Sequence, residues 1–173
     1  MKPALMRQVC ALAVLLAVGC CAVAGSPLGV PFYRQKKDGC GAASVAMVLH
    51  YWENRHPSPE DVYELLYRPS QKGILLADMK RYLEEMTFRV FTLRGNWEDV
   101  EGQLAKARPL IVGLKKKRTA AMHFVVVTGA GEEFVWLNDP TRRQPIRMKR
   151  PEFEKRWALG DRWILLAIPA DRN

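Results

Sequence analysis

The sequence predicts one α+β domain, and the order of its segments carries this prediction. Helical signals dominate from residue 40 to about residue 107, whereas short β-type apolar runs dominate from Pro109 onward. Helices followed by an antiparallel sheet are typical of the α+β class. The 173 residues suffice for one ordinary domain but not for two. We expect the domain to span residues 28–170.

Four helices are expected in the first half of the chain, over residues 41–52, 59–67, 76–86 and 96–107. The first is apolar nearly all round, which is typical of a buried, central helix. Ser58 and Pro59 begin the second helix as N-cap and first helical residue, and two acids follow where the helix dipole favours them. Apolar residues at helical spacing indicate the third helix. Asn96, with Asp99 three residues on, can cap the fourth.

Five short strands are expected in the second half, over residues 110–114, 123–128, 134–138, 146–148 and 163–168. A short helix over residues 151–157 interrupts them. The second and third strands flank the turn sequence GAGEE, so we expect them to pair as a hairpin. The five strands together predict an antiparallel sheet.

Residues 1–24 are expected to be a signal peptide rather than part of the fold. Lys2 and Arg7 precede an uncharged run over residues 9–24 that ends in small residues, which is the pattern of a secretory leader. The run is shorter than the roughly 20 apolar residues that a membrane-spanning helix needs. We therefore expect an exported protein in the periplasm or the cell envelope.

Two ways of cleaving this leader remain open. The sequence Ala-Val-Ala that ends at Ala24 fits an ordinary signal peptidase, whereas LAVGC, which ends at Cys20, resembles a lipoprotein cleavage site. Such sites usually carry leucine three residues before the cysteine, where this chain has Ala17. We favour the second interpretation, which would anchor the protein to a membrane by a lipid on Cys20.

The charge of the chain is strongly positive. The formal net charge is +9, and removal of Lys2 and Arg7 with the leader would leave +7. The export signal argues against nucleic acid as a partner. The basic residues at 115–118 and 142–150 are expected to form solvated or envelope-facing surface, with steering of a substrate as the alternative.

Cys40 is the strongest candidate for chemistry. The other three cysteines lie in the leader, so Cys40 has no evident disulfide partner in an oxidising compartment. A buried cysteine can act simply as a small apolar residue. However, Cys40 lies between two glycines where the central helix begins, and the unpaired N–H groups of a helix start favour a thiolate nucleophile.

His123 and Asp139 are the candidate partners of this thiol. The remaining histidines, His50 and His56, are expected to be packing or surface residues. If the hairpin pairs Thr128 with Phe134, His123 faces Asp139, and directly opposed side chains lie about 4.5–5.5 Å apart at Cβ. The carboxylate could then orient the imidazole, as in a catalytic triad. A strand end followed by a turn is the alternative explanation of the Asp139-Pro140 pair.

Gln35 is the candidate for stabilising an oxyanion. It lies five residues before Cys40, and a loop could bring its side-chain amide beside the Cys40 N–H. Two donors at this position would stabilise the negative oxygen that forms when a thiolate attacks a carbonyl. An isolated glutamine before two lysines is otherwise a surface residue.

These residues, in this order, resemble a known family. The stretches VPFYRQKKDGCGAASVAMVLHYW, RPLIVGLKKKRTAAMHFVVVTGAGEEFVWLNDP and PEFEKRWALGDRWILLAIP are similar to papain-like cysteine peptidases, and more closely to the bacteriocin-processing, double-glycine leader peptidases in a stand-alone form. The resemblance implies a papain-like fold, with the nucleophile helix packed on the sheet. It also implies that Gln35 serves the oxyanion hole, Cys40 is the nucleophile, His123 the base and acid, and Asp139 the residue that orients His123.

The sequence therefore predicts a cysteine endopeptidase that cleaves peptides or proteins in the bacterial cell envelope as a monomer, without a cofactor or metal ion. Two alternatives stay open. The same fold could bind extended peptides without cutting them. The same chemistry could also act on another acyl donor, such as the amide bonds of peptidoglycan.

Overall fold

The computed structural model describes residues 27–52 and 57–172. The expected signal peptide, with Cys20, and His56 lie outside these residues. The helices are α1 (Cys40–Trp52), α2 (Pro59–Leu66), α3 (Leu76–Glu85), α4 (Trp97–Leu104) and α5 (Arg150–Leu159), with a 3-10 turn η1 (Pro69–Gln71). The strands are β1 (Tyr67–Arg68), β2 (Gly73–Ile74), β3 (Phe88–Arg94), β4 (Leu110–Leu114), β5 (His123–Ala130), β6 (Phe134–Asn138), β7 (Ile146–Lys149) and β8 (Trp163–Pro169).

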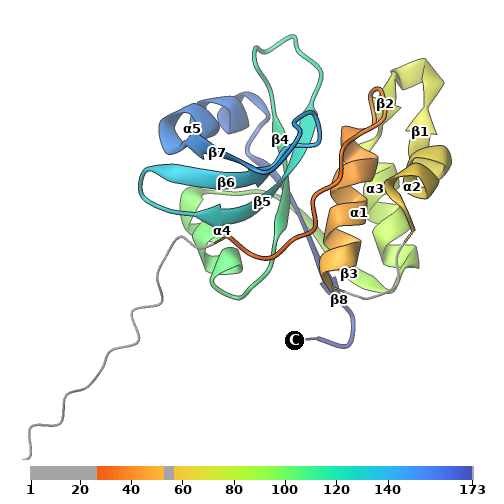
Figure 1. Ribbon diagram of the computed structural model, residues 1–173, viewed down its shortest axis with the longest axis horizontal. Coiled ribbons are helices and arrows are strands. Elements are labelled where there is room, and N and C mark those ends of the chain that lie inside the picture. The colour runs from red at the N-terminus through yellow and green to blue at the C-terminus, as the bar shows by residue number, and fades with distance from the viewer. Residues whose placement is uncertain (1–26, 53–56, 173) are drawn as a thin grey trace, which may run out of the picture.

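Six strands form one antiparallel sheet in the order β3-β8-β4-β5-β6-β7, which confirms the predicted α+β class (Figure 1). Alternate residues of the sheet enter two cores. Helices α1, α2 and α3 pack on the face that carries Phe124 and Val126. Helices α4 and α5 pack on the face that carries Val125 and Val127. Within residues 27–52 and 57–172 no helix is long and apolar enough to cross a membrane.

Helix α1 is central because almost none of its surface is left for water. Nine consecutive residues, from Gly41 to Leu49, are buried, as the all-round apolar sequence predicted. The helix contacts α2 and α3 on one side and β5 on the other. Its first turn is therefore held against the start of β5.

The capping signals act as predicted for two helices. The Ser58 hydroxyl accepts from the Asp61 N–H at 3.1 Å, while the Asp61 carboxylate accepts from the Ser58 N–H at 2.8 Å. Asn96 and Asp99 form the same reciprocal pair. The fourth helix ends at Leu104, earlier than predicted, because the chain turns to a positive φ of 54° at Ala107.

Strand β3 is the main element that the sequence analysis missed. It lies in the helical half of the chain but pairs along its whole length with β8 at the other end of the chain. Two of its apolar residues, Phe91 and Leu93, are exposed, so β3 lacks the clear alternation of a half-buried strand. The short pair β1 and β2 was missed as well. The expected separation into helices first and sheet second is thus incomplete.

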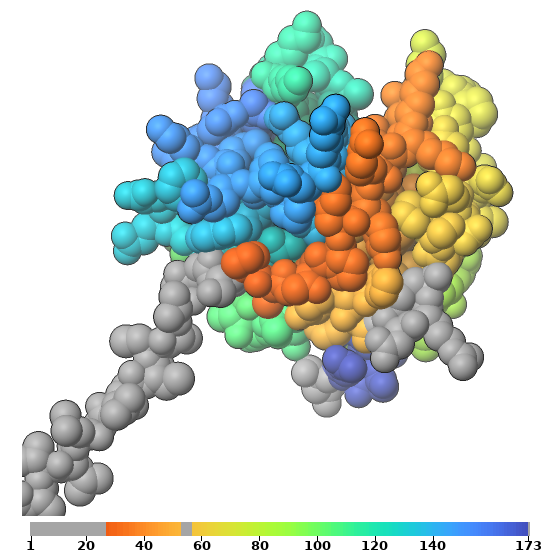
Figure 2. Space-filling view, viewed as in Figure 1, coloured from red at the N-terminus to blue at the C-terminus, as the bar shows by residue number. Residues whose placement is uncertain are grey.

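The N-terminal segment crosses from the sheet to the helices. Residues 27–39 run as an orange band between the blue strands and the yellow helical part (Figure 2). The Leu28 N–H donates to the Thr128 carbonyl at 2.7 Å, and the buried Asn138 side chain donates to the carbonyls of Val30 and Pro31 at 3.0 and 3.2 Å. These bonds hold the segment that leads into α1.

Gly160, at the end of α5, allows the helix to approach strand β4. A Cβ atom at this position would lie 2.3 Å from the Gly113 carbonyl oxygen, which is backbone and cannot swing aside. We expect Gly160→Ala to lower the free energy of unfolding by about 1–3 kcal/mol, as overpacking does. Denaturant unfolding measures this change.

Gly102 supplies the control for this substitution. It is an exposed residue of α4 with nothing within 4 Å of an added Cβ, so Gly102→Ala should raise the free energy of unfolding by roughly 0.8–1 kcal/mol through helix propensity. Equal stability of the Gly160→Ala variant and the unchanged protein would show that α5 and β4 do not approach so closely.

Candidate active site

Cys40 is the first residue of α1 and is half-buried. The Phe124 N–H donates to its sulfur at 3.5 Å. The nucleophile candidate therefore lies at the start of β5, next to His123. The N–H groups of a first helical turn have no partner within the helix, so this turn can stabilise negative charge.

The two glycines beside Cys40 are required by packing. A Cβ atom on Gly39 would lie 2.8 Å from the Tyr63 ring, and one on Gly41 would lie 3.1 Å from the Met79 sulfur. The positive φ in this turn belongs to Asp38, at 56°. Close approach of α2 and α3 thus explains the glycines, and their role as space for a substrate backbone stays a prediction.

His123 connects Cys40 to Asp139. Its Nε2 lies 2.8 Å from Asp139 Oδ1, and its ring lies close enough to the Cys40 side chain for the two groups to interact. Because Asp139 occupies Nε2, Nδ1 is the ring nitrogen left for the sulfur. A thiol, an imidazole and a carboxylate therefore form one connected row, with His123 partly exposed and Asp139 buried.

The pairing that brings His123 and Asp139 together differs from the predicted one. Phe134 does not pair with Thr128. Ala130 pairs with Val135, and after a bulge at Thr128 the pairing continues with Val127 opposite Leu137 and Val126 opposite Asn138. One further residue along this register places Asp139 across from Val125, so His123 is its diagonal neighbour on the same face rather than its direct partner.

The bulge decides the side of the sheet on which Asp139 lies. Without it, the register at Ala130 would place Asp139 opposite Val126, on the face away from His123. The turn sequence alone does not indicate a bulge, which explains why the predicted register was wrong. The predicted register differs from the observed one by two residues. Because side chains along a strand alternate with period two, Asp139 still lies on the predicted face of the sheet, the face of His123.

Asp139 has further partners that the sequence analysis did not identify. Its Oδ1 accepts from the Thr141 N–H at 3.0 Å and from the Thr141 hydroxyl at 2.7 Å. The Arg142 Nε lies 3.6 Å from its Oδ2. Aspartate that accepts from the N–H two residues on is a common turn, so the sequence Asp-Pro-Thr offered a signal for Thr141.

The site holds opposite charges on His123 and Asp139. Burial acts to lower the pKa of His123, but hydrogen bonds with Asp139 and Cys40 outweigh it and raise the pKa to about 9. Burial acts to raise the pKa of Asp139, but hydrogen bonds from His123 and Thr141 hold that pKa well below its usual range. At neutral pH the pair is therefore imidazolium and carboxylate.

Gln35 lines the same groove as Cys40 and His123. The groove has a volume of about 410 Å³ and is walled by residues 71–76 on the helical side and 121–124 on the sheet side. The Gln35 N–H donates to the Pro140 carbonyl at 3.1 Å, which links this residue to the turn after Asp139. The side-chain Oε1 is buried without a protein partner among the described residues.

His50 lies away from the groove near the other end of α1, where its ring stacks on Tyr33 and bonds the Tyr33 hydroxyl. No group of three or more histidines, cysteines or acids in the described part of the chain could hold a metal ion. The groove presents the Cys40 thiol and the His123 imidazole, and Asp139 lies behind the imidazole.

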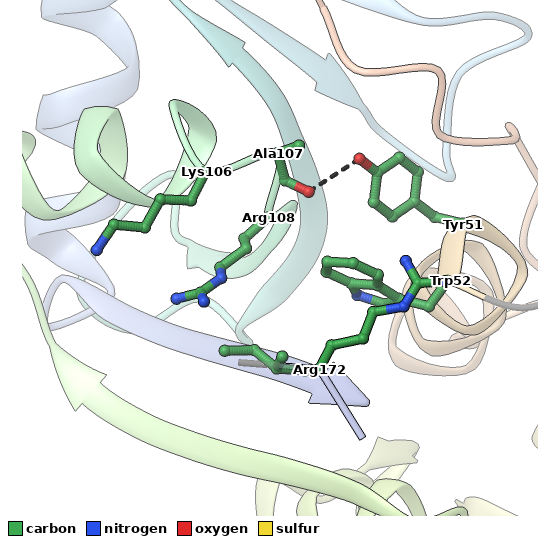
Figure 3. A pocket seen from close by; sticks show the side chains of 7 residues that line it. Tyr51, Trp52, Lys106, Ala107, Arg108 and Arg172 are labelled. Atoms are coloured by element: carbon green, nitrogen blue, oxygen red, sulfur yellow. Dashed lines mark hydrogen bonds between the residues drawn. The ribbon is translucent and has the colours of Figure 1, made fainter. Parts of the chain in front are cut away.

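A larger hollow of about 660 Å³ lies at the far end of α1 (Figure 3). Tyr51 and Trp52 form one side, and Arg172 lies over the Trp52 ring at 5.6 Å. The Tyr51 hydroxyl donates to the Ala107 carbonyl at 2.8 Å. The 13 residues of α1 separate this hollow from Cys40 by about 18 Å along the helix axis, so it is a separate site.

Comparison with known proteins gives one family. The model of the Peptidase_C39 like family matches residues 27–161. Among curated proteins, none matches the chain.

Solved structures share the fold. A protein described as a C39-like peptidase from Bacillus anthracis is 16% identical at a TM-score of 0.68, covering 83% of this chain and 97% of that one. The peptidase domain of Streptococcus ComA, a bifunctional ABC transporter of a quorum-sensing pathway, is 21% identical at a TM-score of 0.63, covering 81% of this chain and 98% of that one. A double glycine motif protease from an AMS/PCAT transporter, solved in complex with the leader peptide, is 23% identical at a TM-score of 0.64, covering 83% of this chain and 94% of that one. These likenesses confirm the predicted papain-like architecture.

The charge state of His123 is directly measurable. In an NMR titration we expect its imidazolium to lose the proton near pH 9. We expect Asp139→Asn to lower this midpoint, because burial lowers the pKa of His123 and the variant lacks the carboxylate that counteracts this effect. The raised pKa also means that the pair stabilises the fold fully below the ordinary pKa of about 6.5 and loses this contribution as the pH rises through about 9.

Glu132→Gln is the matched control, since Glu132 is an exposed carboxylate in the turn of the same hairpin. It should leave the midpoint of His123 in place. A midpoint that does not move in the Asp139→Asn variant would contradict the pairing of the two residues.

Proposed function

The chain belongs to the Peptidase_C39 like family, as the resemblance predicted, and from this membership we propose that it is a cysteine endopeptidase with Cys40 as nucleophile. The observation that carries the proposal is the connected row of Cys40, His123 and Asp139 at the edge of a groove. Gln35 lines the same groove and completes the proposed set of residues.

The first half of the reaction forms an acyl-enzyme. The reaction begins with the proton already on His123 and the sulfur as thiolate, and the Cys40 sulfur attacks the carbonyl carbon of the scissile bond. The carbonyl oxygen becomes an oxyanion, which accepts hydrogen bonds from the Gln35 amide and from the N–H groups at the start of α1. The carbon–nitrogen bond then breaks, and His123 returns its proton to the leaving amine.

The second half releases the product. A water molecule attacks the thioester carbon while His123 accepts one of its protons. The carbon–sulfur bond breaks, the new carboxylic acid leaves, and the site returns to a thiolate beside the protonated His123. Asp139 keeps the imidazole oriented through both halves, and Thr141 and Arg142 hold Asp139.

The substrate is an extended peptide or protein segment in the groove between the two halves of the domain. A related structure contains a leader peptide, which supports peptide binding by this fold. The leader sequence supports export of the protein. We further propose that it acts in the cell envelope as a monomer and that a lipid on Cys20 anchors it to a membrane. No cofactor takes part in the proposed chemistry.

Cys40→Ala tests the proposed nucleophile. The variant should lose all hydrolysis of a peptide library and all labelling of the groove by a thiol-directed inhibitor, because no other side chain that lines the groove replaces the sulfur. Product analysis by mass spectrometry measures the first result, and His50→Gln, at the other end of α1, is the control. Hydrolysis at the normal rate by Cys40→Ala would refute the mechanism. Peptidoglycan fragments in the same assay test the other acyl donor.

Gln35→Ala tests the oxyanion donor. Loss of one donor should lower kcat by about 10²–10³-fold with little change in KM, because the oxyanion exists only after attack on the carbonyl. Steady-state kinetics on the peptide that the library identifies gives both constants. Lys37→Ala, an exposed neighbour in the same segment, should keep the normal kcat. A kcat unchanged by Gln35→Ala would remove Gln35 from the site.

A further inference from the structure

Another hollow also borders His123. Its volume is about 290 Å³, and we call it the leaving-side pocket. His123 and Ala121 line both this pocket and the groove, whereas Cys40 and Gln35 line only the groove. The pocket is bounded by Leu114, Lys115, Lys116, Ala120, Ala121, His123, Asp139, Thr141, Arg142, Met148 and Arg156.

The leaving-side pocket carries an excess of positive charge. Of the residues that the structure describes, four cations line it, and Asp139 is the single acidic one. The Asp139 carboxylate is occupied by His123, Thr141 and Arg142. Arg156 is paired with Glu152. Lys115 and Lys116 have no acidic partner within the described residues, so two cations remain for a ligand.

The cations come from three separate parts of the chain. Lys115 and Lys116 lie in the loop after β4, Arg142 follows β6, and Arg156 lies on α5. The Lys115 N–H donates to the Arg156 carbonyl at 3.0 Å, which fixes this loop against the helix. Figure 2 shows the teal loop after β4 near the blue part of the chain at the upper edge of the molecule. Lys115 and Lys116 of the first basic cluster and Arg142 of the second therefore line one hollow beside the site.

The position of the pocket relates it to one side of the scissile bond. The attacked carbonyl must lie where Cys40 and Gln35 meet, in the groove. The leaving amine must lie within reach of His123, which returns the proton to it. The substrate residues after the scissile bond therefore pass the imidazole, and the leaving-side pocket is the hollow that opens there.

We propose that the leaving-side pocket binds a substrate carboxylate. The protein then preferentially cleaves peptide bonds that are closely followed, in the substrate, by a carboxylate. This inference rests on the proposed function and names the substrate class for it. A carboxylate suits Lys115 and Lys116 as a charge-assisted hydrogen-bond acceptor. The buried side chains of Leu114 and Met148 offer apolar contact to the carbon chain that carries it. Either an acidic side chain or the α-carboxylate of a chain end supplies this group.

Four matched peptides distinguish these sources. All four share the residues before the scissile bond. The residue directly after the bond is Glu in two peptides and Gln in the other two. In each of these pairs, one peptide has a free C-terminal carboxylate two residues further on and the other has an amidated C-terminus. We expect kcat/KM to be about tenfold higher for the favoured carboxylate. A preference for Glu identifies a side chain, and a preference for the free end identifies a terminal carboxylate. Because the lysines are partly exposed, the preference should shrink at 0.5 M salt.

The variant Lys115→Gln/Lys116→Gln should reduce the preference to about twofold or less and leave kcat/KM for the Gln, amidated peptide within about twofold of normal. Lys117→Gln, an exposed neighbour that does not line the pocket, is the control and should keep the preference.

The outcomes separate this inference from the proposed function. Failure to cleave any peptide would overturn the function itself. Equal cleavage of all four peptides, or a preference that survives in the double variant, would overturn only the carboxylate pocket.

Discussion

The bulged pairing of β5 with β6 is the constraint on which the site depends. It brings Asp139 to the face of the sheet that carries His123, and the carboxylate then holds the imidazole at 2.8 Å. A pairing shifted by one residue would separate the two side chains by the thickness of the sheet. The buried apolar faces of both strands make such a shift costly, since it would turn the residues of each core toward the other side. Core packing thereby enforces the geometry of a polar site.

The site lies at the junction where the start of α1 meets the sheet. The first turn of α1 brings Cys40 to the start of β5, because the helix is buried between α2, α3 and the sheet. The segment 27–39 crosses the same junction and is held by Asn138, one residue before Asp139. The Gln35 backbone bonds the Pro140 carbonyl, one residue after Asp139. The turn that holds the carboxylate therefore also fixes the segment that carries Gln35.

Part of the positive charge of the protein is concentrated at one place in the fold, which the composition does not show. A net charge of +9 and two basic clusters are compatible with a solvated surface. Folding brings Lys115, Lys116 and Arg142 together beside His123. There the cations surround a hollow, and the only carboxylate in it is already bonded. Charge that is dispersed along the chain thus becomes a candidate recognition element for the substrate.

The sequence by itself determined the features whose causes are local. The capping pairs at Ser58 and Asn96, the all-round apolar helix after Cys40 and the short apolar strands depend on neighbours within a few residues. The order of Gln35, Cys40, His123 and Asp139 also indicated the family. Tertiary structure decided the bulge, the pairing of β3 with β8 and the basic pocket. Each of these depends on contacts between distant segments, whose pairing is selected by burial in a shared core and leaves no periodic signal in either segment alone.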